Sequence, residues 1–513
     1  MKINSFYITT PIYYVNDIPH LGHAYTSIVS DTLARYKKLN KHEVFFSTGT
    51  DEHGQKVEDS ALNKGKETKA FTDIVSQRFK MLTNKLNLTN NDFIRTTEER
   101  HKKQVSKIWK ELVERNEIYL GDYEGWYSVR DESFISLMDI TTDKNNNKIG
   151  PSKDILKKVK EPSYFFKLSK WQKPLLEFYE KNKDFVKPHT RYNEVIKFVE
   201  QGLDDLSISR TSFEWGIKVP GNSQHIVYVW LDALLNYISV LGDVDSDNYK
   251  NFWPPDIHVV GKDILRFHAI YWPAFLLAVG YKLPKQVYAH GWWTINGEKM
   301  SKSLGNVIDP NYLVDKYGCD QIRYFLLREI PCGKDGNFSE DLLVKRINSD
   351  LANDYGNLVQ RVLSMLQKYF DGKVPSLIAP NDNDSKLLLL PELTCKDIKN
   401  FLDDLNFSAA LEKIWDIIRK ANSYVDNSEP WALYKLNNMD RLGTVLYVLL
   451  NVIFKIAILT QPFLPLASKK ILNLLNQNSI IEYSYINTNL ISGIYLEKPS
   501  AVFPRFIKNS VSV

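Results

Sequence analysis

The chain has 513 residues, of which 43% are hydrophobic and 25% are charged, and its formal net charge is +5. A chain of this length exceeds the size at which one hydrophobic core stops growing, so we expect two or three domains. The composition is that of a soluble globular protein rather than a disordered one. The mildly basic balance permits a polyanionic partner without requiring one.

Cysteine usage and the N-terminus indicate where the protein works. The three cysteines are Cys319, Cys332 and Cys395, and no two of them have the close spacing of a zinc knuckle or a redox pair. The N-terminal residues MKINSFYITTPIYY lack the apolar core and cleavage site of a secretory signal, and they predict a first strand. Both observations fit a reducing, cytoplasmic setting.

One stretch, from Leu442 to Leu459, has the length of a membrane span but includes Asn451 and Lys455. A charged side chain inside a span is costly, and Lys455 has no obvious partner in the sequence. We therefore predict a buried helix of a bundle and no association with a membrane.

The first hundred residues alternate apolar runs such as FYITT and EVFFSTGT with longer amphipathic stretches. This alternation predicts strand, helix and strand in a parallel α/β sheet. Apolar residues recur at helical spacing from Leu21 to Tyr36, so the residues HLGH at 20–23 open a helix.

From about Gly121 to Val219 the pattern is irregular and includes the patch KNNNKIGPSKDILKKVK, which predicts an insertion. Strand signals return at HIVYVW, DIHVVG and QVYAHG, so the sheet is expected to resume after the insertion. Past about Leu351, stretches such as LANDYGNLVQRVLSMLQKYF have helical periodicity and predict an all-α domain.

The HLGH segment is a candidate phosphate-binding site. A helix start presents unpaired N–H groups and the positive end of the peptide dipoles, so a phosphate beside Gly22 can approach the backbone closely. His20 and His23 lie on one side of the first turn, where both rings can donate hydrogen bonds to phosphate oxygens. The alternative is that both histidines only cap and pack.

A second candidate segment, HGWWTINGEKMSKSLGNV, lies just beyond the last strand signal. Lys299 and Lys302, with small hydroxyl residues between them and Gly297 and Gly305 on either side, suit a mobile loop that closes on a polyphosphate. Alone, KMSKS is more typical of a solvated basic loop. Paired with HLGH in this order, it favours a nucleotide site.

The two segments resemble the HIGH and KMSKS signatures of class I aminoacyl-tRNA synthetases, and the chain from Phe6 to about Pro465 resembles the methionyl-tRNA synthetase family. Further segments that carry the resemblance are PIYYVNDIPHLGH, STGTDEHGQK, EPSYFFKLSKWQ, GLDDLSISR, YVWLDALLNYI, VVGKDILRFHAIYWPAFL and NSEPWALYK. It implies an α/β fold: a Rossmann-type catalytic domain at residues 1–120 and 226–325, split by a connective insertion at 121–225, then a linker at 326–350 and an all-α anticodon-binding bundle at 351–513.

The resemblance also implies a reaction in two steps. The carboxylate of methionine attacks the α-phosphorus of ATP and releases pyrophosphate, and a ribose hydroxyl of the 3′-terminal adenosine of tRNA(Met) then takes the methionyl group. No side-chain nucleophile is needed, because catalysis rests on positioning and on neutralising phosphate charge, with Mg²⁺ expected on the polyphosphate.

The resemblance assigns roles to individual residues. Those implied in catalysis are His20, His23, Lys299, Lys302 and Arg210, and those implied in ATP binding are His20, Gly22, His23, Gly261, Asp263 and Lys302. Without the family, Asp263 is explained equally well as a helix N-cap. Nothing in the sequence near Arg210 distinguishes it from a surface charge.

The implied methionine pocket consists of Ile12, Tyr14, Asp51, Trp230, Ala233, Tyr237, Ile264 and His268. Asp51 would pair with the ammonium group, and His268 would lie near the sulfur. Aromatic rings contact a thioether sulfur favourably. Trp230, Ala233 and Tyr237 share one helical face, as do Ile264, His268 and Trp272. Without the family, such faces are most often ordinary core.

The family reads its CAU anticodon in the helical domain. Asn353, Asn357 and Arg361 recur every four residues, and Trp431 follows Pro430. An aromatic plane with a guanidinium suits the stacking of unpaired bases, which assigns Asn357, Arg361 and Trp431 to the anticodon. Without the family, Trp431 is more simply a packing residue.

Two features of the sequence depart from many members of the family, and other synthetases of the same class fit the sequence less well. The segment GDYEGWYSVRDESFI holds no cysteine where many relatives have zinc knuckles, so we expect no zinc. The chain ends without the extra C-terminal module that lets some relatives dimerise, so we expect a monomer. The leucine, isoleucine and valine enzymes have longer editing insertions, and the cysteine enzyme needs zinc-binding cysteines.

Two alternatives come from other classes. An RNA-binding protein that kept the fold and lost its chemistry need not have retained His20, His23 and Lys302. A small nucleotidylyltransferase with only an HxGH motif leaves the helical domain unexplained.

Overall fold

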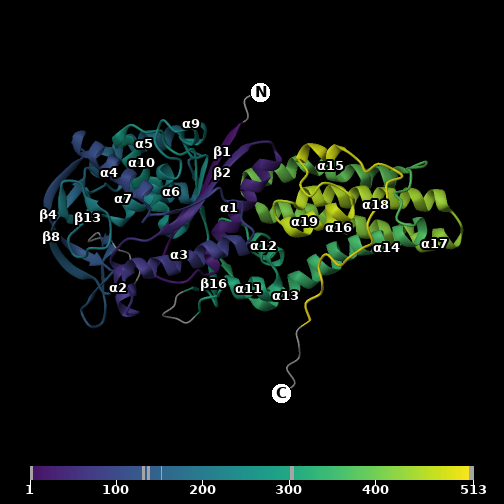
Figure 1. Ribbon diagram of the computed structural model, residues 1–513, viewed down its shortest axis with the longest axis horizontal. Coiled ribbons are helices and arrows are strands. Elements are labelled where there is room, and N and C mark those ends of the chain that lie inside the picture. Colours follow the sequence, from purple (N-terminus) through teal and green to yellow (C-terminus); the bar gives the residue numbers. More distant parts are fainter. Residues whose placement is uncertain (1–3, 130–132, 136–138, 152, 301–305, 508–513) are drawn as a thin grey trace, which may run out of the picture.

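The computed structural model describes residues 4–129, 133–135, 139–151, 153–300 and 306–507. Figure 1 shows an elongated molecule with an α/β part at one end and a bundle of helices at the other. Helices α1 (Leu21–Leu39) and α12 (Cys319–Arg328) lie where the two parts meet. The predicted fold class, a split parallel sheet followed by an all-α domain, is confirmed.

The centre of the α/β part is a sheet of six parallel strands in the order β3-β2-β1-β14-β15-β9. Its strands are β1 (Ser5–Tyr14), β2 (Glu43–Asp51), β3 (Asp92–Arg95), β9 (Val186–Lys187), β14 (Ile257–Gly261) and β15 (Val287–His290). Strands β1 and β14 are neighbours, with Ile8 opposite Ile257. From this pair the chain proceeds to β2 and β3 on one side and to β15 on the other. Open α/β sheets bind ligands at the carboxyl ends of strands where the order reverses in this way.

Side chains of these strands alternate between two buried cores. In β1, Ile8 faces a core shared with α1, whereas Tyr7 faces a core shared with α4 (Glu99–Glu114) and α10 (Trp272–Val279). Residues 44–51 of β2 are all buried, as expected for a strand covered on both faces. The other helices of this part are α2 (Gln55–Asn63), α3 (Thr68–Lys85), α7 (Val229–Leu234), α8 (Asn236–Ser239) and α9 (Asp247–Phe252).

The segment between α4 and α7 forms smaller antiparallel sheets at the outer end of the α/β part. One has the order β10-β8-β4-β5 and another the order β11-β13-β12. The strands are β4 (Ile118–Ser128), β5 (Ser133–Ile135), β6 (Thr141–Thr142), β7 (Lys148–Ile149), β8 (Lys157–Phe166), β10 (Leu206–Ser207), β11 (Ser209–Arg210), β12 (Lys218–Val219) and β13 (Asn222–Val227). The helices are η2 (Leu168–Trp171), α5 (Gln172–Lys181) and α6 (His189–Glu200).

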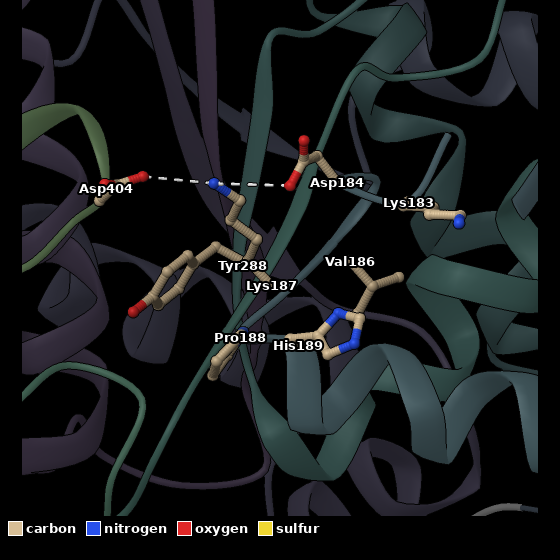
Figure 2. A pocket seen from close by; sticks show the side chains of 8 residues that line it. All are labelled: Lys183, Asp184, Val186, Lys187, Pro188, His189, Tyr288 and Asp404. Carbon is tan, nitrogen blue, oxygen red and sulfur yellow. Dashed lines mark hydrogen bonds and ion pairs between the residues drawn. The ribbon is translucent and has the colours of Figure 1, made fainter. Parts of the chain in front are cut away.

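Edge strand β9 belongs to the same segment and contacts the bundle. Figure 2 shows Lys187 between Asp184 and Asp404, beside a cavity of about 220 Å³. Its Nζ is 3.8 Å from the carboxylate of Asp184 and 3.3 Å from that of Asp404. The lysine charge is thus shared between the sheet edge and the bundle, and the cavity belongs to the joint between the two parts.

Beyond β15 the chain forms a small sheet and then helices that lead to the bundle. The sheet has the order β17-β16-β18. Its strands are β16 (Trp293–Ile295), β17 (Glu298–Lys299) and β18 (Gly336–Asn337), and the connecting helices are α11 (Pro310–Tyr317), α12, α13 (Glu340–Arg346) and the π-helical segment η6 (Ile347–Gly356).

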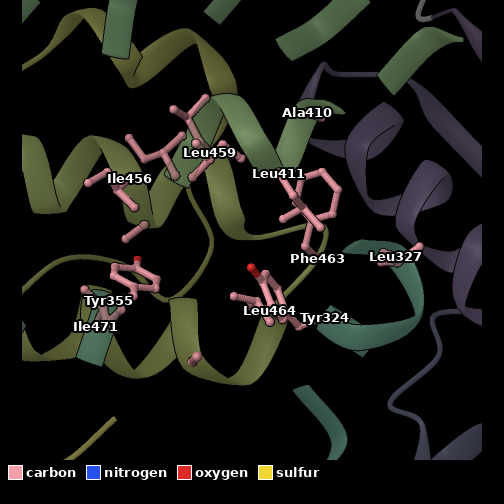
Figure 3. Packing of buried hydrophobic residues seen from close by; sticks show 14 of the residues in the cluster. Tyr324, Leu327, Tyr355, Ala410, Leu411, Ile456, Leu459, Phe463, Leu464 and Ile471 are labelled. Atoms are coloured by element: carbon pink, nitrogen blue, oxygen red, sulfur yellow. The ribbon is translucent and has the colours of Figure 1, made fainter. Parts of the chain in front are cut away.

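The bundle is built around one apolar helix. Its helices are α14 (Asn357–Phe370), α15 (Asp382–Asp403), α16 (Phe407–Ser428), α17 (Pro430–Lys435), α18 (Met439–Thr460), α19 (Pro465–Leu474) and η7 (Tyr483–Asn487). Every residue of α18 from Leu442 to Thr460 is buried. Figure 3 shows Leu459 of this helix near Leu411 of α16, within the same hydrophobic cluster as Tyr355 of η6.

Helix α18 contains the stretch that has the length of a membrane span. Among the described residues it is the one helix long and apolar enough to cross a membrane, and 94% of its most apolar window is buried. The prediction of a buried bundle helix is therefore confirmed. The expectation that Lys455 lacks a partner is wrong, because its buried Nζ forms an ion pair with Glu392 and donates to the carbonyl of Leu388 at 3.3 Å. Both partners lie on α15, far from Lys455 in sequence.

A buried ion pair lies where α1 meets α12. Arg323 and Asp31 are 2.8 Å apart, and both side chains are fully buried. Arg323 also donates to the carbonyl oxygens of Pro462 and Phe463, at 2.9 and 3.1 Å, in the turn between α18 and α19. Burial alone would raise the pKa of Asp31, but the guanidinium groups of Arg323 and Arg35 lower it below its ordinary value. A charged network therefore joins α1 to the bundle.

Replacing Arg323 with methionine should test this joint. The variant keeps much of the side-chain volume but leaves Asp31 as a buried charge with Arg35 and the hydrogen bonds from Thr89 as its remaining partners. We expect the free energy of unfolding in urea at pH 7 to fall by about 3 to 5 kcal/mol. The control Arg100→Met removes a guanidinium that is 41% exposed, and it should cost less than about 1 kcal/mol. Equal losses in the two variants would contradict the importance of the buried pair.

Candidate active site

Two histidines cap the start of helix α1. His20 has an extended backbone, and its Nδ1 accepts a hydrogen bond from the backbone N–H of Gly22 at 3.1 Å. Nδ1 of His23 in turn accepts from the backbone N–H of His20 at 3.1 Å, and the two rings stack with their centroids 3.7 Å apart. This is a capping box built from two imidazoles. Both histidines therefore cap the helix, and this capping is compatible with a chemical role.

The capping box determines which ring nitrogen carries the proton. A neutral imidazole whose Nδ1 accepts a hydrogen bond is protonated on Nε2. Burial, together with the nearby ring of His20, lowers the pKa of His23 well below its ordinary value. Each ring can thus accept with Nδ1 and donate from Nε2 to a phosphate oxygen. Gly22 suits this geometry because an added Cβ would lie 2.9 Å from Cε1 of His20.

The chain that follows the second basic segment returns to the start of α1. Strands β16 and β17 form a hairpin that ends at Lys299. Residues 301–305, which include Lys302, lie outside the described residues. Beyond these residues, the carbonyl of Ile308 accepts a hydrogen bond from the backbone N–H of Leu21 at 3.1 Å. The chain that follows the KMSKS segment therefore contacts the first turn of the helix that HLGH opens at Ile308.

The carboxyl end of β14, the strand next to β1, carries two further residues of the expected ATP site. Strand β14 ends at Gly261, and Asp263 follows in the turn η3 (Lys262–Ile264). The exposed carboxylate of Asp263 accepts from Nε1 of Trp292 at 3.2 Å, and an added Cβ on Gly261 would lie 2.6 Å from it. The N-cap alternative for Asp263 is wrong, because Gly261 occupies the N-cap position of η3 and Asp263 lies within the turn. Such a carboxylate is well suited to accept paired hydroxyl groups.

Three aromatic rings expected in the methionine pocket come together beside β1. Trp230 on α7 stacks on Phe267 of η4 (Phe267–Tyr271), with ring centroids 3.6 Å apart, and its ring is edge-on to His268 at 6.5 Å. The hydroxyl of Tyr237 on α8 is 2.7 Å from Nε2 of His268. The other expected residues belong to this region as well: Ala233 is buried on α7, and half-buried Ile12, Tyr14 and Ile264 pack against the same core. The trio Trp230, Tyr237 and His268 is termed the aromatic cluster below.

The aromatic cluster carries no charge at neutral pH. Nδ1 of His268 donates to the carbonyl of Ile264 at 2.9 Å, so Nε2 accepts from the hydroxyl of Tyr237. Burial lowers the pKa of His268 to about 4 and raises the pKa of Tyr237 above its ordinary value. An uncharged aromatic environment favours a thioether and disfavours a charged side chain.

Asp51 and Arg210 are both buried, but they lie on different elements. Asp51 ends β2 opposite Tyr14, so it reaches the same edge of the sheet as the aromatic cluster. Arg210 is 2% exposed, which corrects the interpretation that it could be a surface charge. Its Nη1 donates to the hydroxyl of Ser207 at 2.8 Å, and its guanidinium lies 4.6 Å from the ring of Tyr228. Because Tyr228 directly precedes α7, Arg210 supports the helix that carries Trp230.

In the bundle, Arg361 of α14 is paired with the last turn of α16, and Trp431 lies in α17, which begins just after α16 ends. Arg361 of α14 forms an ion pair with Asp426 of α16 at 2.8 Å, and Trp431 follows five residues later in α17. Trp431 is 39% exposed, so it is not a packing residue of the core. Asn357 is exposed at the start of α14. Asn353 is also exposed and lies in the π-helical segment η6, which leads into α14.

Phe267 and Trp292 contact residues of the candidate active site but were not identified from the sequence alone. Phe267 supports Trp230 by stacking, and Trp292 donates to Asp263. Both lie in segments rich in aromatic residues, RFHAIYW and HGWW, and this enrichment is the sequence signal that could have identified them. Which ring of such a run faces the site depends on the local helical turn, and η4 is π-helical rather than α-helical.

The chain matches two family models that together cover most of its length. Residues 6–144 and 141–363 match the family model described as tRNA synthetases class I (M), and residues 374–511 match the anticodon binding domain of methionyl tRNA ligase. The chain belongs to the methionyl-tRNA synthetase family. The enzyme is a methionine–tRNA ligase: it activates methionine with ATP and transfers the methionyl group to tRNA.

Its relatives cover nearly the whole chain. It is 50% identical over 510 residues to the methionine–tRNA ligase of Rickettsia conorii, with 98% of this chain and 99% of that protein covered. It is 48% identical over 467 residues to that of Thermotoga maritima, with 91% and 74% covered. The solved methionyl-tRNA synthetase of Mycobacterium tuberculosis in complex with methionyl-adenylate superposes with a TM-score of 0.96 at 43% identity, covering 98% and 100% of the two chains.

An acid titration should reveal the neutral state of His268. Unfolded histidine takes up a proton near pH 6.5, whereas folded His268 does so at about 4. Its contribution to stability is therefore full above pH 6.5 and falls as the pH drops, by about 2 to 3 kcal/mol at pH 4.5. Between pH 7 and 4.5, His268→Gln should lose about 2 to 3 kcal/mol less in urea unfolding than the unmodified enzyme. His189→Gln, at an exposed position, is the control. An unchanged pH dependence in His268→Gln would contradict the low pKa.

Proposed function

We propose that the enzyme forms methionyl-adenylate at the carboxyl edge of its central sheet, between the start of α1 and the aromatic cluster. The observation that carries this proposal is the backbone hydrogen bond from Leu21 to Ile308, which joins the chain after KMSKS to the helix that HLGH opens. ATP and methionine would meet where β1 and β14 lie side by side, the position at which open α/β sheets bind ligands.

ATP is proposed to bind with its α-phosphate at the start of α1 beside Gly22, where backbone N–H groups and the helix dipole attract anions. His20 and His23 donate from Nε2 to the α-phosphate, a role that the capping geometry supports. Lys299 and Lys302 bind the departing pyrophosphate. On the opposite side, Gly261 and Asp263 bind the ribose.

Methionine is proposed to bind with its ammonium group on Asp51 and its side chain in the aromatic cluster. The remaining pocket residues are Ile12, Tyr14, Ala233 and Ile264. Arg210, which the family resemblance associates with catalysis, is proposed to act by positioning α7 through Tyr228. The neutral pair of Tyr237 and His268 supports a thioether ligand rather than a charged one.

The chemistry then needs no covalent intermediate on the protein. A carboxylate oxygen of methionine forms a bond to the α-phosphorus while the bond to the bridging oxygen of pyrophosphate breaks. In the second step, a ribose hydroxyl of the tRNA attacks the carbonyl carbon of the adenylate, and AMP leaves. The site contributes alignment and charge neutralisation to both steps.

ATP is proposed to enter as its magnesium complex, with polyphosphate oxygens and water as the ligands of the ion. Within the described part of the chain, no group of three His, Cys, Asp or Glu residues could hold a metal ion. We also propose that the protein carries no zinc, because the segment GDYEGWYSVRDESFI holds no cysteine.

The bundle is proposed to bind the anticodon of tRNA(Met) through Asn357, Arg361 and Trp431. An exposed indole and a guanidinium are both suited to the stacking of unpaired bases. The bundle and the α1 side of the sheet share one hydrophobic core, so the anticodon site has a fixed distance from the adenylate site. We propose a monomer that works in the cytoplasm.

Pyrophosphate exchange tests the adenylate site. The purified enzyme should exchange labelled pyrophosphate into ATP with methionine but not with leucine, isoleucine or valine. Lys302→Ala should lower kcat for exchange by about 100-fold or more, because the charge on the leaving group is no longer neutralised. Lys173→Ala, which removes a lysine that is 88% exposed, is the control and should not alter exchange. Equal exchange with several amino acids, or normal exchange in Lys302→Ala, would contradict the proposal.

Aminoacylation of tRNA(Met) tests the bundle separately. Trp431→Ala should lower kcat/KM for the tRNA by about 10- to 100-fold, the loss expected for one stacked base. Pyrophosphate exchange should stay within about two-fold, because the adenylate site does not include the indole. The matched control is Tyr485→Ala, at another aromatic residue of this domain that is 51% exposed. Normal charging by the Trp431 variant would remove this residue from the anticodon site.

A further inference from the structure

A buried carboxylate lies on α7, the helix that carries Trp230. Asp232 of α7 is fully buried. One of its oxygens accepts from Nδ1–H of His53 at 2.6 Å, and the other accepts from Nε2–H of His101 at 2.7 Å. Nδ1 of His101 is 3.0 Å from the hydroxyl of Ser239. These four residues are termed the Asp232 cluster.

The Asp232 cluster joins four segments of the α/β part. His53 lies two residues after Asp51 in the loop that follows β2, His101 lies on α4 and Ser239 lies on α8. On α7, Asp232 lies between Trp230 and Ala233. The cluster therefore connects the loop that follows the ammonium-binding carboxylate with the helix that carries the indole of the aromatic cluster.

Because Asp232 is a buried charge, the loss of either hydrogen bond to it would cost a large free energy. Burial alone would raise its pKa, but His53 and His101 overcome that effect and lower it to about 2. An ionised carboxylate only accepts hydrogen bonds, so both histidine nitrogens that face it donate. If His53 moved away, a buried anion would lose a donor that water cannot replace, which is costly.

Glu52, the residue between Asp51 and His53, is bound by groups on the β3 side of the sheet. Glu52 is fully buried, and its carboxylate accepts from Nε and Nη2 of Arg95 at 2.7 and 2.9 Å. The hydroxyl of Thr97 donates to the same carboxylate at 2.6 Å. Glu52 thus anchors the loop to the β3 side of the sheet, while His53 anchors it to α7.

We propose that Asp232 is a positioning residue for methionine, which through His53 sets the loop of Asp51 at a defined distance from α7. The ammonium group and the thioether side chain of one ligand must be bound at the same time, so the two binding elements need a fixed separation. The inference rests on the proposed function, in which Asp51 binds the ammonium group and Trp230 belongs to the side-chain pocket.

The proposal predicts that loss of the Asp232 charge impairs recognition of the ammonium group selectively. Helix α7 keeps its other contacts, including the stacking of Trp230 on Phe267. The side-chain pocket should therefore survive a substitution that releases the Asp51 loop.

Two competitive inhibitors of pyrophosphate exchange separate these effects. Methioninol keeps the ammonium and thioether groups of methionine, and 4-(methylsulfanyl)butan-1-ol lacks the ammonium group. Asp232→Asn should raise the inhibition constant of methioninol by about ten-fold or more and that of the second alcohol by less than about three-fold. The KM for ATP should change by less than about two-fold.

Substitutions of His53 repeat the test from the other side of the hydrogen bond. His53→Ala should reproduce the selective loss of methioninol binding. His53→Asn places an amide N–H donor near the position of Nδ1 and should return the inhibition constant to within about three-fold of the unmodified enzyme. This pair also decides the matter if Asp232→Asn fails to fold. As a control for a buried carboxylate in general, Asp384→Asn in the bundle should change neither inhibition constant.

Asp51→Asn separates this inference from the proposed function. If Asp51→Asn weakens methioninol selectively but Asp232→Asn and His53→Ala do not, the positioning role is refuted while the proposed site stands. Equal weakening of both alcohols in Asp232→Asn would also refute it, because the pocket as a whole would then have collapsed. If Asp51→Asn leaves both inhibition constants unchanged, the proposed role of Asp51 itself fails.

Discussion

A buried charge that must be neutralised where the two parts of the molecule meet constrains the rest of the structure. Asp31 lies within α1 with no access to water, so Arg323 of α12 has to remain against it. Arg323 is in turn held by two carbonyl oxygens of the turn between α18 and α19. The helix that opens with HLGH is thereby attached to the bundle. A ligase that recognises an anticodon far from its site of acylation needs such a rigid connection.

At the start of α1, the same side chains that cap the helix are proposed to bind phosphate. His20 and His23 satisfy backbone N–H groups through Nδ1, which fixes their orientation and leaves Nε2 as the donating nitrogen. A hydroxyl or a carboxylate would cap this helix equally well, but neither would present a second, outward donor to a phosphate. The capping explanation and the catalytic explanation of these histidines are therefore compatible.

Polar groups near the amino-acid site are divided between two environments. His268 and Tyr237 form a neutral pair where the methionine side chain is proposed to bind, because burial there disfavours charge on either group. On α7, Asp232 keeps its charge because two histidines donate to it. A neutral surface suits an apolar ligand, whereas a satisfied buried ion limits how the elements that carry the pocket can move relative to one another.

Local patterns in the chain were enough to predict the parallel sheet, its interruption, the helix that begins at HLGH and the buried helix α18, because hydrophobic periodicity and helix capping involve residues close in sequence. They also singled out HLGH and KMSKS in an order that pointed to a nucleotide. The partner of Lys455, the burial of Arg210 and the Asp232 cluster were decided by tertiary structure. Each depends on hydrogen bonds or ion pairs between segments distant in the chain, and these segments become neighbours only when the sheet closes around β1 and β14 and the bundle packs on α1.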